Sequence, residues 1–230
     1  MLGLVLTSAG RFEEASAALQ RALVMAREQN SPGFEAEALV RQARLLLQWQ
    51  TTELAGHEQA SLKRTGQQRA VLAQAALDAA TPLLATSPEP LRVSQLVLAQ
   101  VQAAHALQRP APSGALARLQ EVASRSTHPL VHVRLAQVQH LLALADGDAK
   151  AAAQSASTHA AQMARTARQA GLLEPLAQAL LFQAQAQDQA QSQAQAWAQE
   201  ALALAQRQGF APVEQAAQAW LHTHPPVPHV

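Results

Sequence analysis

Three histidines near the middle of the chain have a spacing that could bind a metal ion. His128 and His132 are four residues apart, and His140 follows two helical turns later, so one helix could present all three to zinc. Pro129, however, favours the first turn of that helix and puts His128 at its very start. No carboxylate lies at ligand spacing. We therefore expect caps, turn residues and solvated side chains, with zinc binding as the minor alternative.

Motifs for catalysis are missing from the sequence. His57-Glu58 begins like a zinc-protease motif, but the second histidine does not follow. No glycine-rich phosphate loop and no serine in a nucleophile elbow occurs. Paired carboxylates such as Glu13 and Glu14 fall in first helical turns, where they complement the helix dipole. We expect a protein that is not an enzyme, with no metal site and no cofactor.

The composition indicates a helical protein without a charge preference. Of 230 residues, 54 are alanine and 32 are glutamine, both good helix formers. Charged residues make up 14%, with 17 basic against 16 acidic, which argues against nucleic acid or an anionic membrane as a direct partner. The chain has no cysteine and no apolar run long enough to span a membrane. We expect a cytoplasmic location, and the excess of arginine over lysine is typical of a GC-rich bacterial genome.

Apolar periodicity and the positions of glycine and proline predict eleven helices. The stretch 51–66 is predicted to be an irregular connection, partly helical at most, and Thr81-Pro82 should end or kink the fourth helix. The predicted helices lie near residues 1–8, 12–29, 34–49, 67–80, 91–108, 114–124, 130–145, 148–170, 172–187, 190–208 and 212–222.

The glutamine-rich segment 183–196 alternates with a period of two residues, which formally indicates a strand. Because no β-branched residue occurs from Leu172 to Pro212, we predict helix instead. Asp188 and Gln191 resemble a capping box, so we place a helix break there. A single helix across 172–208 is the alternative.

Three helix junctions resemble one another: Ala26–Asn30, Ala167–Gly171 and Ala205–Gly209. Each ends an amphipathic helix, turns on Gly or Asn, and enters a second helix that carries alanines. Helix pairs of roughly 35–45 residues stacked in series describe a helical solenoid. We predict an all-α, right-handed solenoid of about five antiparallel helix pairs over residues 1–222, followed by a flexible tail, 223–230.

Mostly small residues recur where helices of a pair meet, at Gly3, Gly10, Ala15, Leu19 and Ala22, then Gly147 and Ala152, then Ala194, Ala198 and Ala201. With these positions the first helix pair resembles the tetratricopeptide repeat, in which small residues let two helices approach closely. The resemblance is to the degenerate, longer repeats found in large bacterial regulators and signalling ATPases. Arg27 stands where that family usually has proline, and the repeat spacing is nearer 40 residues than 34.

If Gly3 fills the glycine position of the first repeat helix, about five residues of that helix should precede Met1. A helix cut in this way would leave apolar surface and unsatisfied N–H groups. We therefore expect the chain to be a piece of a longer protein or to have its start assigned too late. A naturally short first helix that acts as a cap is the alternative.

The resemblance implies a protein-interaction scaffold that binds a peptide or a partner domain on the surface of the first helix of each pair. Transferred to this chain, the family's groove positions correspond to Arg134, Gln137 and Gln183, with Gln100 as a looser assignment. These side chains would hydrogen-bond an extended or helical segment. The alternative function is a sensor or regulatory segment of a larger transcription regulator or signalling ATPase. The oligomeric state is not predicted.

Overall fold

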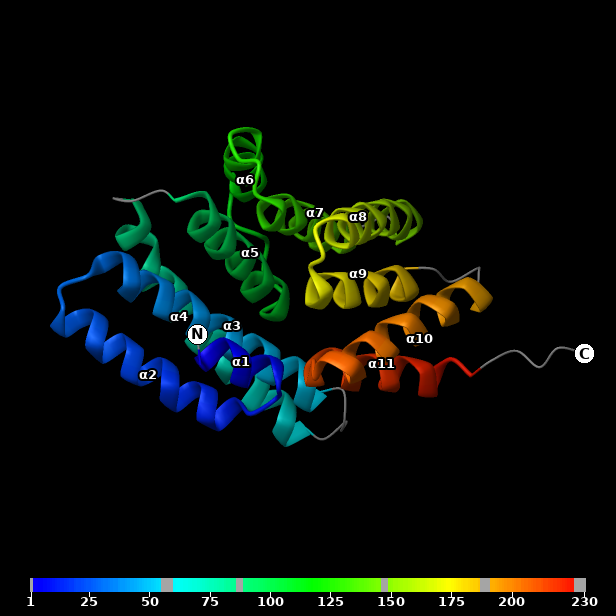
Figure 1. Cartoon of the computed structure of the whole chain (residues 1–230), viewed down its shortest axis with the longest axis horizontal. Helices are drawn as coiled ribbons and strands as arrows, with labels where there is room; N and C mark the ends of the chain where they lie inside the picture. Colours follow the sequence, from blue (N-terminus) through cyan, green and yellow to red (C-terminus); the bar gives the residue numbers. More distant parts are fainter. Residues whose placement is uncertain (1, 55–59, 86–88, 146–148, 187–190, 226–230) are drawn as a thin grey trace, which may run out of the picture. The chain divides into compact units, whose positions relative to one another are not determined.

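The computed structural model describes residues 2–54, 60–85, 89–145, 149–186 and 191–225, and all regular structure in these ranges is α-helical (Figure 1). No described helix is long and apolar enough to cross a membrane. The helices are α1 (Leu2–Ser8), α2 (Phe12–Glu28), α3 (Pro32–Leu54), α4 (Ala60–Ala85), α5 (Pro90–Ala106), α6 (Ala115–Ser124), α7 (Pro129–Leu144), α8 (Ala149–Gln169), α9 (Leu173–Gln185), α10 (Gln191–Gln208) and α11 (Ala211–Thr223).

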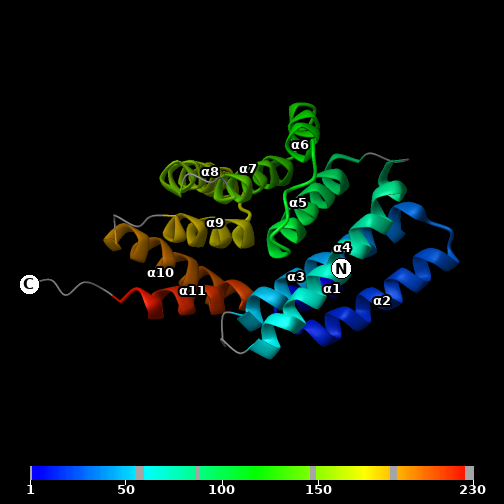
Figure 2. The same ribbon diagram turned by 180° about the vertical axis from the view of Figure 1, so that it is seen from behind.

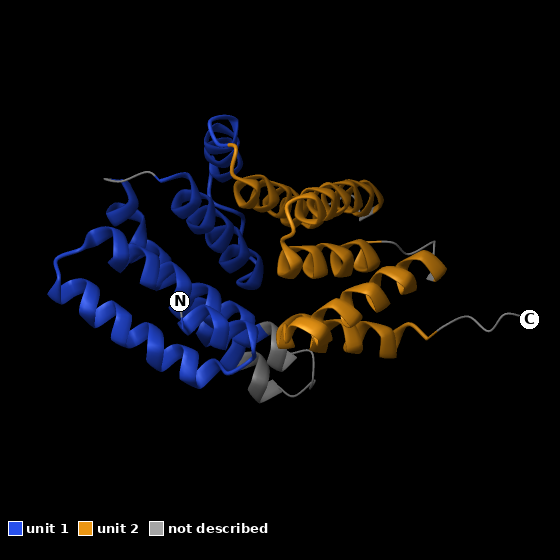
Figure 3. Ribbon diagram, in the orientation of Figure 1, with its two compact units in different colours: residues 1–126 blue, residues 127–230 orange. Residues whose placement is uncertain are grey.

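The helices pack mainly on their neighbours in sequence, as in a solenoid, and the chain divides into two compact units, Met1–Ser126 and Thr127–Val230 (Figure 3). In the first unit each helix from α1 to α6 packs on the next, and α3 also contacts α1 and α5. In the second unit the series runs from α7 to α11, and α9 also contacts α11. The all-α fold predicted from the sequence is confirmed.

Each unit has its own alanine-rich core. In the first unit, Leu77, Leu84 and Leu96 are fully buried among alanines of α3, α4 and α5. In the second, Met163 and Leu180 occupy the corresponding place among alanines of α8, α9 and α10. Alanine on facing helices leaves room for close approach, and a few large side chains then fill the remaining space.

The three similar junctions share one hydrogen-bonding pattern. At each of them the N–H of the residue that follows the Gly or Asn of the turn donates to a carbonyl five residues back, over 2.9 Å. This bond is the helix-ending arrangement that requires a left-handed residue, and Gly171 and Gly209 have φ of 66° and 74°. The donor and acceptor pairs are Ser31 and Ala26, Leu172 and Ala167, and Phe210 and Ala205.

The stretch 51–66 is more regular than predicted. α3 continues to Leu54 and α4 starts at Ala60, while residues 55–59 lie outside the described part. α3 and α4 lie side by side in both views of the ribbon (Figures 1 and 2). A Cβ at Gly66 would lie 3.1 Å from Cγ of Gln50, so this glycine permits close helix packing where the sequence suggested a break. Nearby, the Arg69 guanidinium lies 4.2 Å from the centre of the Trp49 ring.

Thr81-Pro82 is predicted to end or kink the fourth helix, and it does not end it, because α4 continues through Pro82 to Ala85. Proline inside a helix costs about 3 kcal/mol. The last turn, however, carries Leu84 into the core of the first unit, with Leu83 packed against it. Burying a leucine contributes roughly 1.5–3 kcal/mol, which offsets most of that cost.

The glutamine-rich segment is helical in its described parts, up to Gln185 and again from Gln191. Asp188, the predicted cap, lies outside the described residues, as does Gly147. Gln195 is buried, and its side-chain amide donates a 3.0 Å hydrogen bond to the carbonyl of His224. The alternation of glutamine with alanine in this segment is therefore compatible with helix, although it has the period of a strand.

Candidate interaction grooves

The second unit contains an open groove of about 590 Å³ over the middle of α9. We call it the α8–α10 groove. Leu180 and Gln183 of α9 line it between α8 and α10, and Trp197 of α10 adds an aromatic side chain. Its other lining residues are Ser157, Thr158, Ala161, Ala164, Arg165, Arg168 and Glu200.

Charged and polar side chains line this groove beside the apolar ones. Arg168 of α8 reaches across to Glu200 of α10, with Nη2 and Oε1 2.7 Å apart. Both side chains are about half exposed, so the pair is worth at most about 1 kcal/mol in stability. Arg165, one turn before Arg168, is exposed and forms no ion pair with a residue in the described part of the chain. Apolar lining residues together with exposed cations suit a peptide that carries a carboxylate.

The four residues predicted to bind a partner are divided between the two units and differ in exposure. Arg134 is half-buried, and Gln137, on the same helix α7, is only 6% exposed. Gln183 is 8% exposed but lines the α8–α10 groove. Gln100 belongs to the first unit, where its amide donates to Oγ1 of Thr81 over 3.1 Å. Of the four, Gln183 alone lines a groove described here.

His128 and His140, two of the three central histidines, have different environments. His128 caps α7, where its Nδ1 accepts a 3.2 Å hydrogen bond from the backbone N–H of Leu130. His140 is buried, and its Nδ1 lies 2.9 Å from the carbonyl oxygen of Ala156 on α8. Because a carbonyl only accepts, Nδ1 carries the proton in this contact. The His140 ring also stacks on Phe182 of α9, with the two centroids 4.6 Å apart.

His140 therefore joins α7, α8 and α9 within the second unit, a role that the sequence analysis missed. Its spacing from His132 suggested a shared metal-binding face, whereas its burial depends on where α8 and α9 pack. Among the described residues, no group of three or more His, Asp or Glu side chains is arranged to hold a metal ion.

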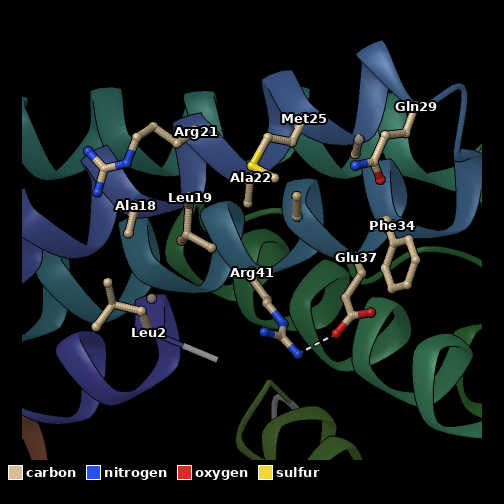
Figure 4. A pocket seen from close by; sticks show the side chains of 13 residues that line it. Leu2, Ala18, Leu19, Arg21, Ala22, Met25, Gln29, Phe34, Glu37 and Arg41 are labelled. Atoms are coloured by element: carbon tan, nitrogen blue, oxygen red, sulfur yellow. Dashed lines mark hydrogen bonds and ion pairs between the residues drawn. The ribbon is translucent and has the colours of Figure 1, made fainter.

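The first unit contains a second groove, of about 620 Å³, between α1, α2 and α3 (Figure 4). We call it the α1–α3 groove. Its exposed apolar residues are Leu2, Met25 and Phe34, at 60%, 55% and 59% exposure. The remaining lining residues are Gly3, Ala18, Leu19, Arg21, Ala22, Ala26, Gln29, Glu37, Ala38 and Arg41.

The acidic group of this groove is already paired within the first unit. Glu37 and Arg41 form an ion pair on α3, drawn as a dashed line in Figure 4. Arg92 of α5 approaches the other oxygen of Glu37 to 3.7 Å and Glu89 to 3.0 Å, and its guanidinium lies 5.7 Å from the centre of the Phe34 ring. An occupant therefore meets an apolar surface more than a charge.

Most repeat positions predicted from the resemblance lie in helix contacts. A Cβ added to Gly3 would lie 2.9 Å from Cδ2 of Leu19, which shows how closely α1 approaches α2. Ala22 differs, because it is exposed and lines the α1–α3 groove. The positions buried in the structure are Gly3, Ala15, Leu19, Ala152, Ala194, Ala198 and Ala201.

No protein-family model matches the chain, and no curated protein matches it.

Proposed function

We propose that this chain is a non-catalytic interaction scaffold, a solenoid of the tetratricopeptide-repeat kind, that holds a peptide or partner domain in the α8–α10 groove. The observation that carries the proposal is the position of Gln183. It is a partner-binding residue predicted from the sequence, and it lines an open groove beside Trp197.

The chemistry of the groove suggests how a partner would bind. Leu180 and Trp197 offer apolar contact, and the Gln183 amide can both donate and accept hydrogen bonds. Arg165 is available for a carboxylate of the partner, and Arg168 can exchange Glu200 for a second one at little cost, because their pair is exposed. A helical or extended segment with apolar residues and an acidic side chain fits this arrangement.

The alternative function, a sensor segment of a larger regulator or signalling ATPase, stays a prediction.

Site-specific photo-crosslinking in cells tests the scaffold proposal. A photoreactive amino acid replaces Thr158, which lines the groove, and in a control it replaces Gln215, which is exposed on α11 of the same unit. We expect a discrete crosslinked protein from position 158 and none from position 215. The captured protein is then identified, purified and titrated against this chain and its Arg165→Glu/Arg168→Glu variant.

The variant should bind the identified partner at least about tenfold more weakly, because two charge-assisted contacts become repulsive. Equal capture at both positions, or equal affinity of the variant, would contradict the proposal for this groove. Circular dichroism checks that the variant keeps its helices.

A further inference from the structure

We infer that Glu200 determines which segments the α8–α10 groove accepts: a segment that brings an acidic residue to Arg168 must also bring a basic residue to Glu200. The inference rests on the proposed function and adds to it the charge pattern of the partner.

The ion pair of Arg168 and Glu200 joins two helices of the groove that are not neighbours in sequence. α9 packs on both α8 and α10 and lies between them (Figures 1 and 2). Arg168 comes from α8 and Glu200 from α10, and both line the groove together with Leu180 of α9. Because Nη2 and Oε1 are 2.7 Å apart, an occupant that uses Arg168 has to separate these two charges.

The order of residues along the helices gives the position of this pair in the groove. α8, α9 and α10 follow one another after a few residues, as antiparallel neighbours do. Trp197 packs against the cluster that contains Ala184, near the end of α9. Glu200 follows three residues later, about 5 Å further along α10. An apolar side chain held at Trp197 is therefore about one helical turn from the charged pair.

The two arginines of the groove are not equivalent. Arg165 is exposed and can pair with a carboxylate of the partner without a change in the groove. Arg168 is already paired with Glu200, and separating this exposed pair costs little. The released Glu200, however, stays within a few ångströms of any carboxylate that takes its place at Arg168, and two like charges at such a distance repel each other.

A basic residue in the same segment removes this repulsion, because it pairs with the released Glu200. One exposed ion pair is then exchanged for two, and each charge of the groove keeps an opposite charge beside it. A segment with acidic residues alone leaves Glu200 unpaired next to a second carboxylate. Repulsion of this kind excludes wrong partners and so provides specificity.

The size of the groove limits how far apart these groups can be. Its volume of about 590 Å³ lies in the range of single ligand sites, so it holds only a few side chains. In a helical segment, side chains three or four residues apart lie on one face. The partner class is therefore a helical segment with an apolar residue, an acidic residue and a basic residue spaced by about one turn each.

Selection from a library of random displayed peptides tests the inference on the purified full chain. The library is selected in parallel against the unaltered chain, Glu200→Gln and Arg165→Glu/Arg168→Glu. We expect the unaltered chain to enrich peptides with an acidic and a basic residue one turn apart. Glu200→Gln should keep the enrichment of the acidic residue and lose that of the basic one, and the double variant should lose the acidic one. Glu121→Gln is the matched control, because it removes the carboxylate of another exposed ion pair, 3.0 Å from Arg125 in the first unit, and it should select the same peptides as the unaltered chain.

Fluorescence anisotropy with one selected peptide gives the size of the effect. Replacing the basic residue of the peptide by glutamine should weaken its binding to the unaltered chain about tenfold. The same replacement should change its binding to Glu200→Gln by less than about twofold, because the partner of the basic residue is then missing.

Two results would overturn the inference, and they differ in what they mean for the proposed function. If Glu200→Gln still enriches the basic residue, or if that residue contributes equally to binding by both chains, Glu200 does not select the partner, although peptides that depend on the arginines would still support binding in the groove. If no selected peptide depends on Arg165 and Arg168, the proposed function in this groove is wrong as well. Circular dichroism checks that each variant keeps its helices.

Discussion

The two grooves of this chain differ in what they leave for another molecule. In the α1–α3 groove the charged Glu37 is held by Arg41 and Arg92, and the exposed apolar side chains are Leu2, Met25 and Phe34. The α8–α10 groove is lined by both apolar and polar residues, and the exposed Arg165 and Arg168 are among them. The same helix-pair framework thus presents an apolar surface in one unit and an amphipathic one in the other.

His140→Ala should have the largest effect and should act on the second unit alone. The substitution removes a buried ring from between α7, α8 and α9, together with its hydrogen bond to the Ala156 carbonyl. We expect a loss of about 3 kcal/mol in the free energy of unfolding. Hydrogen exchange in the helices of each unit measures the result.

If hydrogen exchange accelerates equally in both units, the contacts of His140 do not stabilise the second unit alone, and the prediction is wrong. His105→Ala, at an exposed position of α5, is the control and should change little.

Gly3→Val should have an intermediate effect, confined to the first unit. The added side chain meets Leu19 at a point where even a Cβ lies 2.9 Å from Cδ2. Overpacking of this kind costs about 1–3 kcal/mol. We expect α1 to lose part of its packing on α2, and chemical denaturation followed by the fluorescence of Trp49, which packs beside Phe12, measures it. An unchanged unfolding midpoint would mean that α1 is not held by this contact.

The smallest effect concerns pH. Burial lowers the pKa of His159 below its ordinary value of 6.5, because the charged imidazolium is disfavoured there. Nδ1 of His159 is buried and has no hydrogen-bond partner among the described residues. The unfolded state therefore takes up a proton first as the pH falls, so this group's contribution to stability is present above pH 6.5 and is lost at lower pH.

His159→Gln should make the unfolding midpoint of the second unit less dependent on pH between about 5 and 7. The exposed His105→Gln in the first unit serves as the control. A pH dependence that is identical in the wild type and His159→Gln would contradict the assignment.

The sequence was informative wherever local chemistry decides the structure. The turns at Gly171 and Gly209 follow from residues that tolerate a left-handed backbone, and alanine at Ala15, Ala198 and Ala201 follows from close helix contacts. The predictions at Pro82 and Gly66 failed because tertiary packing decides both places. Leu84 is buried beyond Pro82, and Gly66 lies against Gln50 of the neighbouring helix.

The grooves were harder to predict. Met25 and Phe34 are large apolar residues on helices, yet both are more than half exposed. Ala22 matched a position of close helix contact in the repeat, but it is exposed in the structure. Of the residues predicted to bind a partner, Gln183 lines a groove, whereas Gln100 bonds to Thr81 within the first unit. Which polar side chain stays available is set by neighbours distant in sequence.

The central claim is that the α8–α10 groove of the second unit binds a partner, and one measurement tests it most directly. The photoreactive residue at position 158 is introduced into the Arg165→Glu/Arg168→Glu chain, and its crosslinks are compared with those of the same probe in the chain without these two substitutions. We predict that the discrete crosslinked protein is lost or strongly reduced in the variant. Unchanged capture, in a variant that keeps its helices by circular dichroism, would contradict the claim.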